Sequence, residues 1–219
     1  MSAAAIAVLT GDLVDSTKRS ADQIALAMRA IEAAAAKFST WHSPAKDTRF
    51  TRSRGDGWQM VIAEPQYALR AAVVIQGKLI AMGMESRIFA GIGTSDSLGS
   101  STLADASGEA FVRSGQGLDS MGDAWRIGID KEGIRPEDQL IAELLGERMG
   151  RWTAAQAEAA AMQLASPFKI TTLFEIGKEL NISPQAVNDR VRGAGCATIA
   201  SVLRRWEGLK VREGWGTTK

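Results

Sequence analysis

The sequence has very few of the residues that form disulfides or bind soft metal ions: its 219 residues include one cysteine, Cys196, and one histidine, His42. A single cysteine excludes an internal disulfide framework and any multi-cysteine metal site. A single histidine excludes a histidine-rich zinc or haem site. We expect both residues to be structural or incidental. Any bound metal must therefore be held mainly by carboxylates, which suit Mg²⁺ or Mn²⁺.

Long apolar runs and an excess of one charge are also missing. The longest apolar candidates are interrupted by Arg70, Lys78 or Glu85, so none approaches the ~18 residues that cross a bilayer. The first ten residues have no basic segment before their apolar stretch, unlike a signal peptide. Lysine plus arginine (26) nearly balances aspartate plus glutamate (25), which argues against a protein that coats nucleic acid non-specifically. We expect a cytoplasmic protein with no membrane partner.

The first 130 residues alternate between strand and helix patterns. Apolar residues make up 45% of the chain and charged residues 23%, as in an ordinary globular protein. The predicted strands cover residues 5–10, 48–53, 58–63, 86–94 and 124–130, and the predicted helices 21–38, 65–82 and 109–121. Ser20 is a suitable N-cap for the first helix, and Gly55-Asp56-Gly57 favours a hairpin between the second and third strands. The order indicates an α+β fold with an antiparallel hairpin.

Strand signals stop at residue 136. The predicted helices of this part cover residues 136–151, 153–165, 171–180, 184–193 and 198–206. Charge, glycine and proline cluster over residues 131–136, which is typical of a domain boundary. We therefore predict one domain over residues 1–132 and a small all-α domain over residues 133–219.

Two carboxylates stand out by their positions. Asp12 follows the first strand and Asp56 lies at the tip of the hairpin, each beside glycine. Carboxylates that converge from adjacent strands bind hard divalent cations, and such ions carry nucleotide phosphates. The alternative is that both are ordinary turn residues, because aspartate is a favoured turn former.

The turn after the first strand is a candidate phosphate site. Residues 13–17 lead toward a helix, and their free N–H groups, together with Ser16 and Thr17, suit phosphate oxygens. Asp15 is a third acid in this turn, and it could equally serve as a helix N-cap.

Four segments resemble class III nucleotidyl cyclases, in the order of that family. They are GDLVDST, RSRGDGWQMVI, SRIFAGIGTS and DASGEAFVRSGQGLD. All four lie within residues 5–130. The resemblance implies a ferredoxin-like sheet with flanking helices, Mg²⁺ or Mn²⁺ as cofactor, a nucleoside triphosphate as substrate, and a homodimer with the site at its interface.

The resemblance also implies roles for individual residues. Asp12 and Asp56 match the pair that holds two metal ions, and Leu13 matches the position whose carbonyl completes that site. Arg52 and Asp105 match the lysine–aspartate pair that recognises adenine. Because arginine presents a planar fork where the family has lysine, a pyrimidine base is as reasonable as adenine.

The sequence departs from the family at two further positions. Val112 stands where the family has an asparagine, and Gln116 where it has the arginine that stabilises the transition state. Loss of such a contact costs about 10²–10³ in rate. Arg113 is the candidate catalytic substitute, and the alternative is an ordinary solvated helix charge. GEAFVRSG is similar to a segment of bacterial SatD-type proteins, which combine a cyclase-homology domain with a C-terminal helix-turn-helix.

Residues 172–195 have the pattern of a helix-turn-helix. Ser183 and Pro184 fit the N-cap and first position of the second helix. Between residues 185 and 212 there are six basic residues and two acidic ones, which suits a polyanion. The predicted DNA-binding residues are Lys178, Gln185, Asn188, Arg190 and Arg192. The alternative is a helical bundle that only supports the first domain or a dimer.

Two functions remain open from the sequence. One is an enzyme that converts a nucleoside triphosphate into a cyclic nucleotide and pyrophosphate with Mg²⁺ or Mn²⁺. The other is a transcription regulator whose cyclase-like domain is catalytically degenerate and senses a nucleotide. A homodimer is expected in both cases, because helix-turn-helix proteins bind paired half-sites as dimers.

Overall fold

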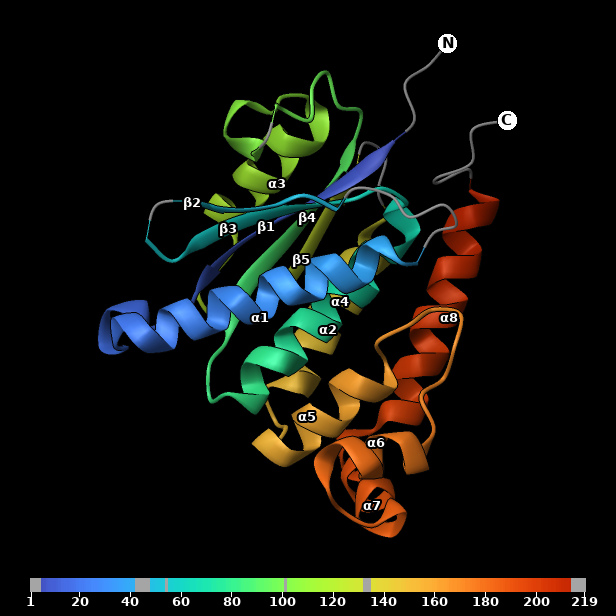
Figure 1. The fold of residues 1–219 in the computed structure, drawn as a ribbon. Coiled ribbons are helices and arrows are strands. Elements are labelled where there is room, and N and C mark those ends of the chain that lie inside the picture. Colours follow the sequence, from blue (N-terminus) through green and yellow to red (C-terminus); the bar gives the residue numbers. More distant parts are fainter. Residues whose placement is uncertain (1–4, 42–47, 54, 101, 132–134, 214–219) are drawn as a thin grey trace.

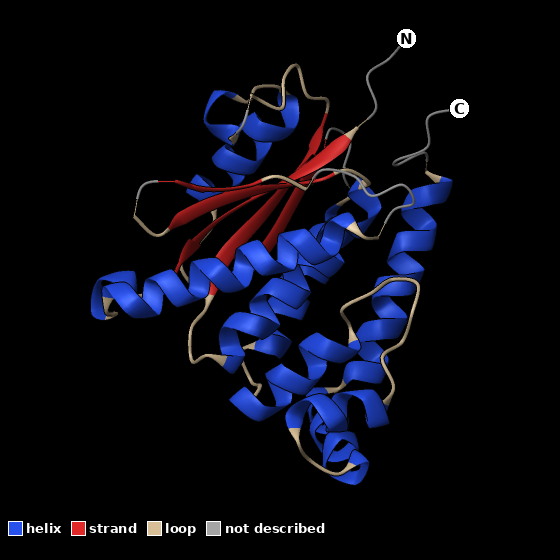
Figure 2. Cartoon of the chain, in the orientation of Figure 1, coloured by secondary structure: helices blue, strands red, loops and turns tan. Residues whose placement is uncertain are grey.

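The structure, a computed structural model, describes residues 5–41, 48–53, 55–100, 102–131 and 135–213. Within these ranges it has an α+β architecture of one five-stranded mixed sheet and eight α-helices (Figures 1 and 2). The predicted α+β class is thereby confirmed, whereas the ferredoxin-like sheet and the helix-turn-helix domain stay predictions. His42 and part of the predicted domain boundary lie outside the described residues.

The strands follow the predicted order along the chain. They are β1 (Ile6–Leu13), β2 (Phe50–Ser53), β3 (Gly57–Ile62), β4 (Ser86–Gly93) and β5 (Ile127–Lys131). In the sheet their order is β2-β3-β1-β4-β5, with β4 and β5 parallel and all other neighbours antiparallel. The last strand begins later than predicted because residues 122–125 form a turn, closed by a 2.9 Å hydrogen bond from the Trp125 amide to the Gly122 carbonyl.

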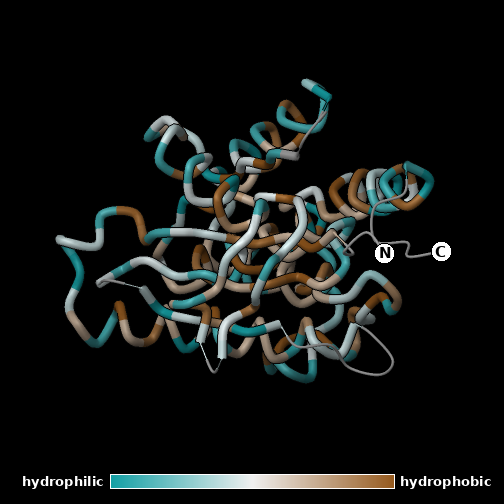
Figure 3. The backbone as a smooth tube through the Cα atoms, turned by 90° about the horizontal axis from the view of Figure 1, so that it is seen from above, coloured by the Kyte–Doolittle hydropathy of each residue, from teal (hydrophilic) through white to brown (hydrophobic). Residues whose placement is uncertain are grey.

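Helices cover both faces of the sheet. One face is covered by α1 (Ala21–Ser39), α2 (Ala68–Ala81) and α4 (Pro136–Met149), and the other by α3 (Glu109–Ser120) (Figure 1). The predicted N-cap Ser20 forms a capping box with Gln23 at the start of α1. Short 3₁₀ turns, η1 (Ser16–Lys18), η2 (Pro65–Tyr67) and η3 (Leu103–Asp105), connect the larger elements. Hydrophobic colour recurs along the strands at the centre of the molecule (Figure 3).

The C-terminal helices extend the same hydrophobic core. They are α5 (Ala154–Gln163), α6 (Leu173–Leu180), α7 (Pro184–Ala194) and α8 (Cys196–Arg212). One buried cluster contains both Ala7 of β1 and Leu203 of α8. Trp152 belongs to that cluster, and its indole N–H donates to the Ala194 carbonyl at 2.9 Å. The division at residues 132 and 133 stays a prediction, and the apolar core is continuous across it.

Two buried ion pairs attach α8 to the helices under the sheet. Arg70 of α2 donates to both carboxylate oxygens of Glu207, at 2.6 and 2.9 Å. Burial raises the pKa of the Glu207 carboxyl, against the lowering by Arg70. Lys210 pairs with Asp138 of α4, and both side chains are about 1% exposed. Because a charge left alone in such a place is costly, these pairs fix the position of α8.

Among the described residues, no helix combines the length and apolar character needed to cross a bilayer.

Candidate functional site

Asp12 and Asp56 lie at the same end of two adjacent strands. Asp12 is near the end of β1 and is paired in register with Gly57, the first residue of β3. The Leu13 amide donates to the Asp56 carbonyl at 3.2 Å, which joins the two backbones at this point. The Leu13 side chain is buried in the main core. The fold thus brings the chain segments of the predicted metal residues together.

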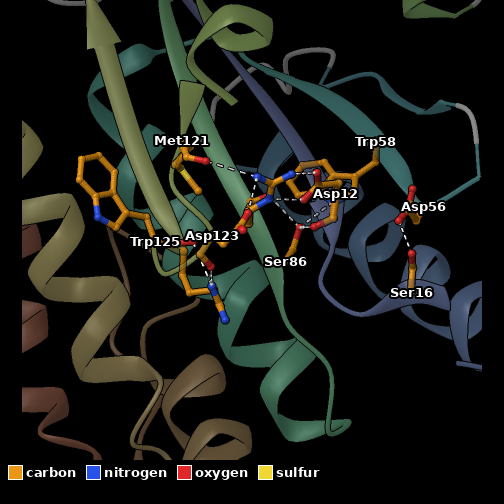
Figure 4. Close-up of polar contacts among 10 residues, drawn as sticks. Asp12, Ser16, Asp56, Trp58, Ser86, Met121, Asp123 and Trp125 are labelled. Atoms are coloured by element: carbon orange, nitrogen blue, oxygen red, sulfur yellow. Dashed lines mark hydrogen bonds and ion pairs between the residues drawn. The ribbon is translucent and has the colours of Figure 1, made fainter. Parts of the chain in front are cut away.

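The two carboxylates, however, have different partners. Asp12 faces Arg87 across β1 and β4. Its oxygens accept hydrogen bonds from Arg87 Nε, at 3.0 Å, and from Nη2. This interaction raises the pKa of the Arg87 guanidinium. The Asp56 carboxylate accepts a hydrogen bond from the Ser16 hydroxyl, toward which it points in Figure 4.

This arrangement does not fit the two-cation site that the cyclase resemblance implies. A metal ion at Asp12 would have to displace the guanidinium that already occupies both carboxylate oxygens. No group of three histidine, cysteine, aspartate or glutamate side chains in the described parts of the chain is arranged to hold a metal ion. Arg87 already supplies a positive charge to the Asp12 carboxylate. Binding of Mg²⁺ or Mn²⁺ stays a prediction.

A buried hydrogen-bond network supports the Asp12 backbone. The Ser86 hydroxyl donates to the Asp12 carbonyl at 2.6 Å and accepts from the Trp58 indole at 3.2 Å. Gly11 permits this packing, because a Cβ there would lie 2.5 Å from the Trp58 ring. The sequence analysis missed Ser86, Trp58 and Arg87. The strand pattern of residues 86–94 was visible, but the register that sets these residues beside Asp12 was not.

Many polar groups of the turn after β1 form hydrogen bonds within the turn itself. Amides of Lys18 and Arg19 donate to the carbonyls of Asp15 and Ser16, at 2.9 and 3.0 Å. Asp15 precedes η1 in the left-handed conformation, with φ 54°, and makes no side-chain cap hydrogen bond. Its pKa is lowered by its hydrogen bond and ion pair with Lys18. Thr17 is exposed. The predicted phosphate-binding turn therefore presents Thr17 to solvent, while Ser16 is engaged with Asp56.

The predicted base-recognition residues, Arg52 and Asp105, have separate hydrogen-bond partners. Arg52 donates twice to the Gly55 carbonyl, at 2.9 and 2.6 Å. Asp105 accepts from the Ser100 amide at 3.3 Å. Within the described residues Arg52 and Asp105 share no hydrogen bond or ion pair. Their segments are nevertheless linked, because the Leu103 amide donates to the Thr51 hydroxyl at 2.8 Å.

Arg113, the predicted catalytic residue, lies between two acidic side chains. It pairs with Glu109 at 2.7 Å and with Asp130 at 3.1 Å. The hydrogen bonds that Arg113 donates to the Glu109 carboxylate are the main reason that the pKa of the Arg113 guanidinium is raised. Arg113 and Gln116 line a groove of 420 Å³ beside β5. Because two carboxylates neutralise its charge, this arginine is poorly placed to stabilise a developing negative charge.

Both helices of the predicted helix-turn-helix have capped ends, and the second begins at the expected signals. Thr172 forms a capping box with Glu175 at the start of α6, and Asn181 ends that helix in the left-handed conformation. Ser183 caps α7 by accepting from the Ala186 amide at 3.1 Å, and Pro184 takes the first helical position. The predicted cap at Ser183 and the predicted position of Pro184 are thus confirmed.

The predicted DNA-binding residues differ in exposure. Lys178, Gln185 and Arg192 are exposed, and Asn188 is half-buried. Arg190 is half-buried and pairs with Glu158 of α5 at 3.2 Å. Opposite the exposed face, Ile176, Val187 and Val191 are buried. The polar face of α7 is therefore available to a partner, with Arg190 as its most restrained member.

No protein-family model matches this chain, and no curated protein matches it at a significant level. The function is therefore argued from the arrangement of the residues.

Proposed function

We propose that the chain is a DNA-binding regulator. In this proposal α6 and α7 form a helix-turn-helix, and the sheet domain is a cyclase-like domain that binds a nucleoside triphosphate without efficient cyclisation.

The observation that carries the proposal is the two-sided character of α7. Val187 and Val191 are buried, while Gln185 and Arg192 on the same helix are exposed. A helix held in this way can place polar side chains in the major groove of DNA, where glutamine suits adenine and arginine suits guanine. Lys178 of α6 is exposed and suits a backbone phosphate.

The order of the first elements supports a cyclase-like domain. The succession β1-α1-β2-β3-α2-β4 is the βαββαβ arrangement of a ferredoxin-like sheet. Strand β5 extends this core at the β4 edge, and helix α3 covers the second face of the sheet (Figure 1). This order of elements supports the architecture that the resemblance of the four segments implies.

Three features favour a sensor over an enzyme. Arg87 occupies the Asp12 carboxylate, and Arg113 is neutralised by Glu109 and Asp130. Val112 is 54% exposed and has no group that could hydrogen-bond a ribose. Each feature removes an electrostatic or hydrogen-bonding contribution that phosphoryl chemistry requires.

A nucleotidyl cyclase is the second candidate. It is favoured by the placement of Asp12 and the segment bearing Asp56 at one end of adjacent strands. In that case a nucleoside triphosphate with Mg²⁺ or Mn²⁺ would have to separate Asp12 from Arg87.

DNA binding is tested by fluorescence anisotropy with DNA from upstream of the protein's own gene, at several salt concentrations. We expect Arg192→Ala to weaken binding by about 1–3 kcal/mol, the usual value for an arginine that contacts a base. Arg151→Ala is the control, because Arg151 is also an exposed arginine but lies outside α6 and α7 and pairs with Glu147. Equal binding by both variants, or no binding by the unaltered protein, would refute the DNA-binding proposal.

The two candidates are separated by incubating the protein with each nucleoside triphosphate and Mn²⁺ and analysing the products. The regulator proposal expects binding without cyclic product. Cyclic product that disappears in Asp56→Ala would establish the cyclase instead.

A further inference from the structure

A cavity of 750 Å³ lies between α7, the start of α8 and the segment 164–172. Its volume is within the ~300–1,000 Å³ of small-molecule sites. Much of its wall is apolar, including Leu164, Phe168, Ile170, Leu173, Val191 and Cys196. Burial raises the pKa of the Cys196 thiol to about 12, so this side chain is a neutral part of the wall. The cavity can therefore hold an apolar group.

The charged residues of the same cavity are all positive. Arg70, Arg192 and Arg204 line it, and no aspartate or glutamate does. Arg70 is already neutralised by Glu207. In the part of the chain that the structure describes, the side chains of Arg192 and Arg204 have neither an ion-pair nor a hydrogen-bond partner, although the charge of Arg204 also acts on the Glu207 carboxylate. Two guanidinium groups beside an apolar wall match a ligand with an apolar body and an acid group.

The start of α8 adds to this positive potential. Gly195, with φ 74°, precedes the helix, and no side chain caps its first turn. Residues 195–198 line the cavity. Free N–H groups at a helix N-terminus favour negative charge. These N–H groups, like the two arginines, favour a negatively charged ligand.

We propose that this cavity binds a small amphipathic carboxylate, with its hydrocarbon part against the apolar wall and its acid group paired with Arg192 and Arg204. Arg192 and Asn188 belong to α7, so an occupied cavity draws Arg192 away from DNA. The ligand thereby weakens DNA binding. This regulatory consequence rests on the proposed DNA-binding function, whereas the binding of the carboxylate does not.

The binding test uses octanoate and its uncharged analogue octanol, titrated calorimetrically into the full-length protein. We expect octanoate to bind at least about tenfold more tightly than octanol, because only the former pairs with guanidinium groups. Arg204→Gln should weaken octanoate binding about tenfold. Arg205→Gln is the matched control, because Arg205 is the exposed neighbour of Arg204 on α8 and does not line the cavity.

Three results would overturn the site: no octanoate binding at millimolar concentration, equal affinity for octanol, or equal effects of the Arg204 and Arg205 substitutions. Circular dichroism checks that both variants are folded. A cavity-filling variant, Ala197→Trp, should abolish binding of both probes.

The regulatory consequence is tested separately by anisotropy with labelled DNA and saturating octanoate. Weaker DNA binding in octanoate, with no such effect of octanol, is expected. If octanoate binds and the affinity for DNA is unchanged, the regulatory coupling is wrong. If octanoate binds and the protein has no affinity for DNA at all, the DNA-binding function fails and the carboxylate site stands.

Discussion

Asp12 and Arg87 lie directly opposite each other on β1 and β4, and two guanidinium nitrogens donate to the Asp12 carboxylate. Both side chains are 26% exposed. The Arg87 guanidinium therefore binds the Asp12 carboxylate where the sequence predicts a divalent cation. The site is accessible to solvent.

Removal of this arginine should favour a metal ion at Asp12. We expect Arg87→Gln to strengthen Mn²⁺ binding about tenfold, because the carboxylate loses an internal cation worth on the order of 1.5 kcal/mol. Isothermal titration or the electron paramagnetic resonance signal of free Mn²⁺ measures the change. Arg126→Gln is the control, because Arg126 pairs with Glu85. Equal Mn²⁺ affinities in the two variants would count against competition between Arg87 and a metal ion.

The turn between α6 and α7 depends on a glycine inside α6. A Cβ on Gly177 would lie 2.7 Å from the Ile182 carbonyl oxygen, although alanine is the better helix former. We expect Gly177→Ala to destabilise the protein by about 1–3 kcal/mol, the usual cost of overpacking. In α8 a Cβ on Gly208 meets no atom within 4 Å, so Gly208→Ala should stabilise by about 0.5–1 kcal/mol. Thermal unfolding measures both, and the same sign for both would be inconsistent with this packing.

The Arg70–Glu207 pair should contribute far more to stability than an exposed pair. Glu207→Ala leaves the Arg70 guanidinium, 3% exposed, without its carboxylate, which costs about 3–5 kcal/mol. Glu147→Ala breaks the exposed pair with Arg151 and should cost less than about 1 kcal/mol. Urea unfolding of the two variants gives the comparison. Similar midpoints would mean that Arg70 finds another partner or water.

Low pH should loosen the start of α6. Hydrogen bonds from Thr172 and the ion pair with Lys169 lower the pKa of Glu175 from 4.5 to about 2. Because the folded-state pKa is the lower one, this stabilisation is complete above about pH 4.5 and is lost as the pH falls toward 2. The amide resonance of Thr172 should therefore titrate near pH 2. Glu175→Gln keeps a capping side chain and should remove that titration, whereas a midpoint near 4.5 would show that the capping box is absent in solution.

Cys196 should be unreactive in the folded protein. It is 1% exposed, and burial raises its thiol pKa to about 12, so almost no thiolate is present near pH 8. We expect its reaction with a disulfide reagent to be slow in buffer and to become fast in denaturant. Rapid reaction in buffer would show that the start of α8 exposes Cys196 to solvent.

The local elements of this protein were predictable from sequence because their signals act over a few residues. Ser20 and Ser183, both predicted as N-caps, each accept a hydrogen bond from an amide three positions later. Asp56 and Gly57 follow the pattern of a hairpin, and β2 and β3 are antiparallel neighbours. These contacts are satisfied within one turn or hairpin, so neighbouring residues were sufficient to predict them. The nucleotide and DNA contacts depend on partners and stay predictions.

The chain alone determined its α+β class, the order of its strands and helices and the caps that begin several helices. Only the tertiary structure decided what stands opposite Asp12, because Arg87 is 75 positions away and is brought there by the register of β1 and β4. It likewise decided that Arg70 pairs with Glu207, 137 positions away, and that one hydrophobic core joins the sheet to the C-terminal helices. Such pairings depend on how whole elements pack, and the periodicity of one segment carries no information about the segment that it will face.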